Sequence, residues 1–112
     1  MKCDIRIEAV LYISCGGAII GGKGLVESLK AIEEAGSIRA AAEKLGINYR
    51  RLWTRIKHAE TILGARLVET DRKGSKLTPL ARRIIAAYEL MEHILKKHGI
   101  ESFNITDAEC EA

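Results

Sequence analysis

The chain has 112 residues, of which 47% are hydrophobic, with 18 Lys or Arg against 15 Asp or Glu. This length allows one domain with a single modest core, and no apolar run approaches the roughly 18 residues of a membrane span. Cys3, Cys15 and Cys110 lack metal-type spacing, so we expect reduced thiols. The start of the sequence does not show a charged segment followed by an apolar segment, the pattern of a secretory signal peptide. The sequence therefore predicts a cytoplasmic protein.

The N-terminal part of the chain predicts a strand followed by a short return strand. Hydrophobic and polar side chains alternate over residues 3–13, which is typical of a half-buried strand. Val10 and Tyr12 make the far end of this strand apolar on both faces, so we expect that end to be covered. The glycine pair at 16–17 can turn the chain, and residues 18–20 can return beside it.

Two interpretations compete for the segment that leads into the first predicted helix. Residues 17–23, GAIIGGK, match the phosphate-loop pattern G-x-x-x-x-G-K. The next residue is Gly24, however, where such a loop needs Ser or Thr to hold magnesium. We therefore favour glycines that serve a hairpin and the entry to a helix over about residues 23–35, which Gly36 ends. The inward side chains of that helix are expected to be Leu25, Leu29 and Ile32.

Residues 36–56, GSIRAAAEKLGINYRRLWTRI, predict two short helices joined by a tight turn. Gly46 is expected to stop the first helix, and Asn48 is a good N-cap for the second. Apolar side chains recur with helical spacing in both: Ile38, Ala41, Ala42 and Leu45, then Leu52, Ile56, Ala59 and Leu63. The opposite face of the second helix is polar and basic, with Arg50, Thr54, Lys57 and Thr61, flanked by Arg51 and His58. This pattern is typical of a helix-turn-helix that binds DNA. The alternative interpretation is an ordinary helical hairpin whose basic face is exposed to solvent.

Residues 66–78 predict a second small hairpin, bent around residues 71–75. Thr78 can cap a last helix whose first residue is Pro79, where the missing N–H costs nothing. That helix is expected to run to about His98. A helix-turn-helix followed at once by a basic hairpin is a winged helix. The predicted fold class is therefore mainly α with small β-hairpins: a winged helix-turn-helix with an N-terminal β-hairpin and a long C-terminal dimerisation helix.

The charges are unevenly distributed along the chain. Residues 39–83 hold 12 Lys or Arg against 4 Asp or Glu, a net charge of +8, whereas the rest holds 6 basic and 11 acidic residues, a net charge of −5. A basic field over the helix-turn-helix and the hairpin suits a polyanion. We expect residues 1–98 to form the DNA-binding domain and residues 99–112 to form an acidic, flexible tail.

Residues 36–56, followed by LVETDRKGSKLTP at 67–79, resemble the N-terminal DNA-binding domain of the ModE-type molybdate-responsive regulators and, more loosely, the LysR-type regulators. The shared features are the GSI opening, the G-I-x-Y-x-x-x-W run at 46–53, the LVE strand and the LTP helix start. The resemblance spans roughly residues 4–98. It implies DNA binding. The wing is shorter and lacks the glycine-rich insertion, and because no C-terminal molybdate-binding module follows, molybdate binding is not expected.

Twelve residues are the expected DNA contacts: Ser37, Arg39, Asn48, Tyr49, Arg50, Arg51, Thr54, Lys57, His58, Arg72, Lys73 and Lys76. Arg50 and Arg51 open the reading helix, where arginine suits guanine O6 and N7, although phosphate is its commoner partner. Ser37 can act as a plain N-cap, hold a phosphate at the helix N-terminus, or do both. Trp53 is expected to pack rather than to contact a base. For the wing cations we favour DNA contact over a solvated loop.

The last predicted helix favours a homodimer. Its apolar stripe comprises Leu80, Ile84, Ala87, Tyr88, Met91, Ile94 and Leu95, widened by Ile85 and Leu90. Two such helices packed antiparallel would set two reading helices about one DNA turn apart.

No catalytic arrangement is evident in the sequence. It suggests no nucleophile–base pair, and its three histidines lack a zinc pattern, so we predict neither an enzyme nor a cofactor. The predicted function is a homodimeric, sequence-specific transcriptional regulator that binds a pseudo-palindromic site on double-stranded DNA. Two alternatives remain open: a sequence-indifferent architectural DNA-binding protein, and a winged-helix module for protein interaction.

Overall fold

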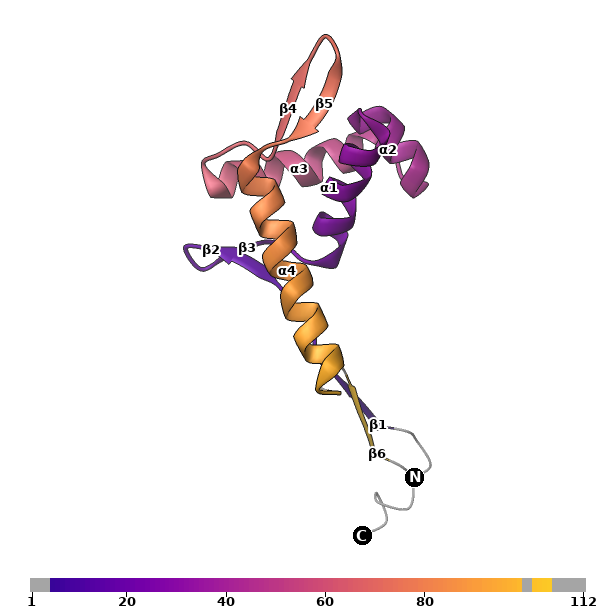
Figure 1. Ribbon diagram of the computed structural model, residues 1–112, viewed down its shortest axis with the longest axis vertical. Coiled ribbons are helices and arrows are strands. Elements are labelled where there is room, and N and C mark those ends of the chain that lie inside the picture. The colour runs from indigo at the N-terminus through magenta and orange to yellow at the C-terminus, as the bar shows by residue number, and fades with distance from the viewer. Residues whose placement is uncertain (1–4, 100–101, 106–112) are drawn as a thin grey trace.

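The computed structural model describes residues 5–99 and 102–105. Four helices and three two-stranded antiparallel sheets make up this part of the chain. In chain order they are β1 (Ile5–Glu8), β2 (Ile13–Cys15), β3 (Ala18–Gly21), α1 (Lys23–Ala35), α2 (Ile38–Leu45), α3 (Tyr49–Leu63), β4 (Val68–Asp71), β5 (Gly74–Leu77), α4 (Pro79–Lys97) and β6 (Ser102–Ile105). Helices α1–α3 form a head, the β4–β5 wing projects from it, and α4 extends away from it on the other side (Figure 1). The predicted winged helix-turn-helix is confirmed.

The core lies between α1, α2, α3 and the base of the wing. Leu29 and Ile32 of α1 pack with Leu52 and Ile56 of α3, and all four are fully buried. Burial of each such side chain stabilises the fold by about 1.5–3 kcal/mol. Helix α2 contributes the small residues Ala41 and Ala42, which let its backbone approach α1 closely. Leu67 and Leu77, at the two ends of the wing hairpin, close the core.

The turn of the helix-turn-helix begins at a glycine, as its sequence predicts. Gly46 has φ +68° and ends α2, and its N–H bonds to carbonyls of the last helical turn. A left-handed residue here allows the chain to leave α2 and enter α3 within three residues. The hairpin β2–β3 likewise turns at Gly16 and Gly17, whose φ values are +58° and +84°. Residues 17–23 therefore form a hairpin and a helix entry, as favoured over a phosphate loop.

The single strand predicted over residues 3–13 is wrong. Within the described residues the segment divides into β1, which pairs with β6, and β2, which pairs with β3. Its far end is not covered, since Val10 is 63% exposed and Tyr12 is 66% exposed. Alternation indicates only that a segment is amphipathic. The core of this domain is complete without the far end of the segment, so no element of the described chain covers that end on both faces.

Strand β6 lies inside the segment 99–112 for which the sequence predicts a flexible tail. For residues 102–105 that expectation is wrong, because they pair antiparallel with β1, with Ile5 opposite Ile105 and Glu8 opposite Ser102. Residues 106–112 lie outside the described part of the chain. The prediction of a tail rests on the acidic composition of this segment, and composition alone does not indicate whether a backbone pairs with a distant strand.

Helix α4 has two different halves. Its first turns pack on α1 and β5, where Leu80, Ile84 and Ile85 are partly buried against the core. Tyr88 is buried one turn further on, but the apolar side chains beyond it are not: Leu90, Met91 and Ile94 are all exposed. The apolar stripe predicted on this helix is therefore used by the chain's own core only in its N-terminal half.

The described residues contain neither a membrane-spanning helix nor a cluster of metal-ligating side chains. None of the helices there is long and apolar enough to cross a membrane. No group of three or more His, Cys, Asp or Glu side chains is placed there to hold a metal ion. Cys15 is a free thiol, whereas Cys3 and Cys110 fall outside the described residues.

Candidate nucleic-acid interface

Both helices of the helix-turn-helix begin at a side-chain cap. The Ser37 hydroxyl oxygen accepts a hydrogen bond from the N–H of Ala40 at 3.0 Å. The Asn48 Oδ1 accepts from the N–H groups of Arg50 and Arg51 at 2.7 and 3.3 Å. Both predicted N-caps are confirmed. The oxygen of Asn48 is therefore used within the protein, which leaves its amide NH₂ as the group available to DNA.

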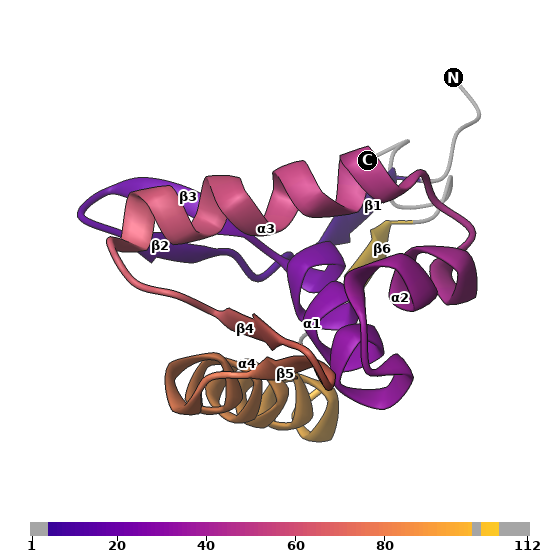
Figure 2. The same cartoon turned by 90° about the horizontal axis from the view of Figure 1, so that it is seen from above.

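A groove of about 470 Å³ separates the reading helix α3 from the wing. It is lined by residues of α2, α3 and the wing: Ser37, Ile38, Arg39, Tyr49, Trp53, Ile56, Lys57, Arg66, Val68, Thr70 and Ser75. Four of the predicted contacts thus meet in one groove, although they come from positions up to 20 residues apart along the chain. Figure 2 shows the elements that supply the lining residues, α2, α3 and the wing, seen from above. Arg66 lines the same groove and was not among the predicted contacts.

The other predicted contacts do not line this groove. Arg50 and Thr54 line a second hollow, of about 420 Å³, on the outer face of α3. Arg51 and His58 are exposed but line neither hollow. The β4–β5 hairpin projects from the head (Figure 1). It carries three exposed cations that do not line the groove: Arg72, Lys73 and Lys76.

The cations of the basic segment divide into two classes. Four are engaged within the protein: Lys44 pairs with Glu34, Lys57 Nζ lies 3.2 Å from Glu60 Oε1, Arg82 Nε lies 3.2 Å from Glu33 Oε2, and Arg55 donates to Ser28 Oγ at 2.8 Å. No salt bridge involves the other eight cations among the described residues: Arg39, Arg50, Arg51, Arg66, Arg72, Lys73, Lys76 and Arg83. The uncompensated positive charge therefore gathers around α3, the start of α2 and the wing.

Glu60 holds the wing to the reading helix, a role that the sequence analysis missed. Its side chain is 9% exposed, and its Oε2 accepts from the N–H groups of Leu67 at 2.7 Å and Val68 at 3.2 Å. Burial by itself would raise the pKa of this carboxyl group, but the two N–H donors and Lys57, 3.2 Å from Oε1, outweigh it and lower the pKa. Glu60 is therefore a buried, ionised anchor at the base of the wing.

A second contact fixes the wing from the other side. The N–H of Ser75 donates to the carbonyl oxygen of Gly36 at 2.7 Å. A Cβ at Gly74, where φ is +126°, would lie only 2.5 Å from that same oxygen, so only glycine allows the approach. The Thr78 hydroxyl donates to Arg66 O at 2.8 Å and accepts from the N–H of Ala81 at 3.2 Å, which joins the wing to α4. The wing is therefore positioned rigidly relative to α2 and α3.

Trp53 does not pack in the core, contrary to the prediction. Its side chain is 43% exposed and lines both hollows of α3. Lys57 Nζ lies 5.8 Å from the centre of its ring, and the Arg39 guanidinium lies 4.6 Å from that of Tyr49. Both distances allow a cation–π interaction. The core is filled by Leu52 and Ile56, so the indole is placed on the outer side of the helix.

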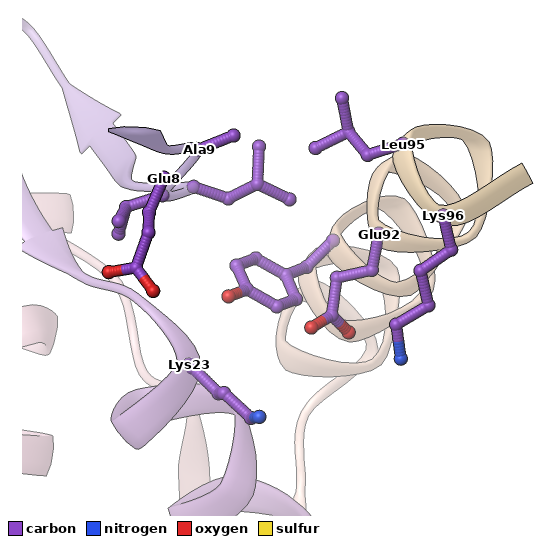
Figure 3. A pocket seen from close by; sticks show the side chains of 9 residues that line it. Glu8, Ala9, Lys23, Glu92, Leu95 and Lys96 are labelled. Carbon is purple, nitrogen blue, oxygen red and sulfur yellow. The ribbon is translucent and has the colours of Figure 1, made fainter. Parts of the chain in front are cut away.

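A further hollow of about 440 Å³ lies between α4, the start of α1 and the end of β1 (Figure 3). Two carboxylates and two amines line it, from Glu8, Lys23, Glu92 and Lys96. The charges balance, so this hollow does not extend the basic field around α3.

The arrangement of α2, α3 and the wing has a counterpart among known families. Residues 24–82 match the family described as bacterial regulatory helix-turn-helix proteins of the lysR family. The chain belongs to this family. The match covers more than half of the 112 residues and includes α1, the helix-turn-helix, the wing and the start of α4. The predicted LysR-type relationship is thus confirmed, and residues 24–82 form the helix-turn-helix domain of this family.

Individual relatives of this LysR-type chain include a molybdenum-pterin-binding protein and a transcriptional regulator. The molybdenum-pterin-binding protein MopB of Rhodobacter capsulatus is 37% identical over 95 residues, covering 80% of this chain and 34% of MopB. The transcriptional regulator ModE of Haemophilus influenzae is 28% identical over 105 residues, covering 83% of this chain and 41% of ModE. The chain therefore spans less than half the length of these relatives.

Solved structures similar to this LysR-type chain include the DNA-binding domain of CbnR in complex with DNA. It has a TM-score of 0.56 and 22% identity, and the match covers 68% of this chain and 87% of that one. The BenM DNA-binding domain with benA site 1 DNA also gives a TM-score of 0.56, with 24% identity, covering 69% of this chain and 91% of that one. These likenesses establish the shared winged-helix fold.

Proposed function

We propose that the chain binds double-stranded DNA with the face formed by α3, the start of α2 and the wing, and that it regulates transcription from a specific site. The observation that carries this proposal is the gathering, around α3 and the wing, of cations that have no salt-bridge partner within the described part of the chain. Lys or Arg side chains of this kind bind phosphates by releasing condensed counterions. No catalytic step is part of the proposal.

The proposed contacts follow from where each side chain lies. Arg50, in the first turn of α3, is placed for a base edge in the major groove, and guanine O6 and N7 suit its guanidinium. Arg39 at the start of α2 and Arg72 and Lys73 at the wing tip are placed for phosphates. The remaining proposed contacts are Ser37, Asn48, Tyr49, Arg51, Thr54, Lys57, His58 and Lys76.

We further propose that two copies pair through α4. Leu90, Met91 and Ile94 are exposed on its C-terminal half, and an apolar hollow of about 270 Å³ lies between this helix and the segment at 11–13. A second α4 packed antiparallel would cover these side chains. Two reading helices would then be about 34 Å apart, and the preferred site would be pseudo-palindromic. Such a regulator would act on chromosomal DNA in the cytoplasm.

Selection of bound duplexes from a random DNA pool by the full 112-residue chain tests this proposal. Enrichment of a pseudo-palindrome whose half-site centres are about 10 bp apart is the expected result. Binding without any enriched sequence would instead indicate an architectural DNA-binding protein, and no binding at all would indicate a module for protein interaction.

A further inference from the structure

The reading helix carries two aromatic side chains that the core does not use. Tyr49 and Trp53 are four residues apart on α3, and they are 40% and 43% exposed. Both rings lie in the first half of the helix, on a surface otherwise rich in cations. Large aromatic side chains lose favourable burial when they stay in water, so an exposed pair at this position indicates a partner surface.

The surroundings of the two rings limit what that partner can be. Tyr49, Arg50, Trp53 and Thr54 line a hollow of about 420 Å³ on the outer face of α3, and its walls are more apolar than polar. Cations flank the rings, with Arg39 over Tyr49 at 4.6 Å and Lys57 near Trp53 at 5.8 Å. The hollow therefore suits a small apolar group carried by a polyanion.

We propose that this hollow receives the C5 methyl group of a thymine in the major groove, and that Trp53 and Tyr49 thereby determine sequence preference. The inference rests on the proposed function. The groups that the bases expose in the major groove are hydrogen-bond donors and acceptors, except for the methyl group of thymine, which is apolar. Arg50 lies beside the hollow and its guanidinium suits a guanine, so the thymine that is read lies next to that guanine. The flanking cations then face the phosphates on either side.

Deoxyuridine substitution tests this assignment, because it removes the methyl group and leaves base pairing unchanged. The duplex enriched by the 112-residue chain from a random pool is resynthesised with each thymine replaced in turn by deoxyuridine, and affinity is measured by fluorescence anisotropy. One thymine per half-site, adjacent to a guanine, is expected to lose about fourfold in affinity when its methyl is removed. Equal affinity for every deoxyuridine duplex would overturn the proposal while leaving specific DNA binding intact.

Three variants separate the methyl contact from effects of deoxyuridine on DNA shape. Trp53→Ala is expected to bind the thymine and deoxyuridine duplexes with nearly equal affinity, whereas Trp53→Phe keeps a ring and keeps most of the preference. Arg72→Ala, in the wing, is expected to weaken both duplexes and leave their ratio unchanged. If Trp53→Ala, shown to be folded by circular dichroism, retains the full fourfold preference, the methyl is read elsewhere and the proposal is wrong. A wild-type chain that enriches no sequence would instead contradict the proposed function itself.

Discussion

The carboxylate of Glu60 on the reading helix accepts a hydrogen bond from the backbone N–H of Leu67 at 2.7 Å, at the base of the wing. The same oxygen accepts from Val68, so a single buried side chain satisfies two N–H groups where the chain leaves α3 and enters β4. This contact couples the two elements that are proposed to hold DNA. Its loss would affect both the stability of the domain and the position of the wing.

Glu60→Ala should lower the free energy of unfolding by about 2–4 kcal/mol, because it leaves two buried N–H donors without an acceptor. Urea denaturation followed by circular dichroism measures this change. Glu69→Ala is the matched control, since Glu69 is exposed on β4 and its removal should cost no more than about 0.5 kcal/mol. Equal losses for the two variants would show that Glu60 does not anchor the wing.

The same carboxylate predicts a pH dependence. The pKa of Glu60 in the folded protein lies below its ordinary value of 4.5, so the stability from its ionised form is present above pH 4.5 and is lost as pH falls through the folded pKa. Glu60→Gln cannot ionise, so the stability gap between wild type and this variant should narrow between about pH 5 and pH 3. Denaturation curves at several pH values measure the gap. A gap that is constant over this range would contradict the role of the charge.

Arg50 and Lys73 are expected to contribute differently to DNA binding. Arg50→Ala should reduce discrimination between the enriched and a random duplex by about 1–3 kcal/mol, because Arg50 is proposed to contact a base edge. Lys73→Ala, at the wing tip, should weaken both duplexes nearly equally, as the loss of a phosphate contact does. Anisotropy titrations at one fixed salt concentration compare the two variants. Equal losses on both duplexes for both variants would favour an architectural binder.

A charge placed in the exposed stripe of α4 should separate the proposed dimer. Met91→Glu puts a carboxylate into the apolar seam, where it has no partner. Sedimentation should show a folded monomer whose DNA affinity is much reduced, because one half-site no longer assists the other. His93→Glu, an exposed position on the same helix, is the control and should stay dimeric. A dimeric Met91→Glu that binds DNA normally would move the interface away from α4.

The helices were predictable because each has strong local signals at both ends. Helix α1 runs from Lys23 to Ala35, as expected from its apolar spacing and from Gly36. Asn48 and Thr78 start α3 and α4 because their side chains replace missing backbone partners, a short-range effect that sequence reports well. The same holds for the two hairpins, whose turns are local.

The errors concern interactions between segments that are distant in the sequence. The pairing of β1 with β6 joins the two ends of the described chain, and no local pattern specifies it. Whether Trp53 is buried depends on how much of the core other residues have already filled. Glu60, by contrast, left a signal: it lies four residues after Ile56 and three before Leu63, beside the apolar stripe, where an acid requires donors.

The face formed by α3, the start of α2 and the wing is proposed to bind DNA, and NMR tests this directly. A 12.3 kDa chain is small enough for amide chemical shifts to be followed by NMR while the enriched duplex is added. The largest changes in chemical shift on adding DNA should fall on residues 37–39, 48–58 and 72–76. Residues at the outer end of α4 should change little between the DNA-free and the DNA-bound protein. Changes concentrated instead on α4 and β1, or spread evenly over the surface, would contradict the proposed interface.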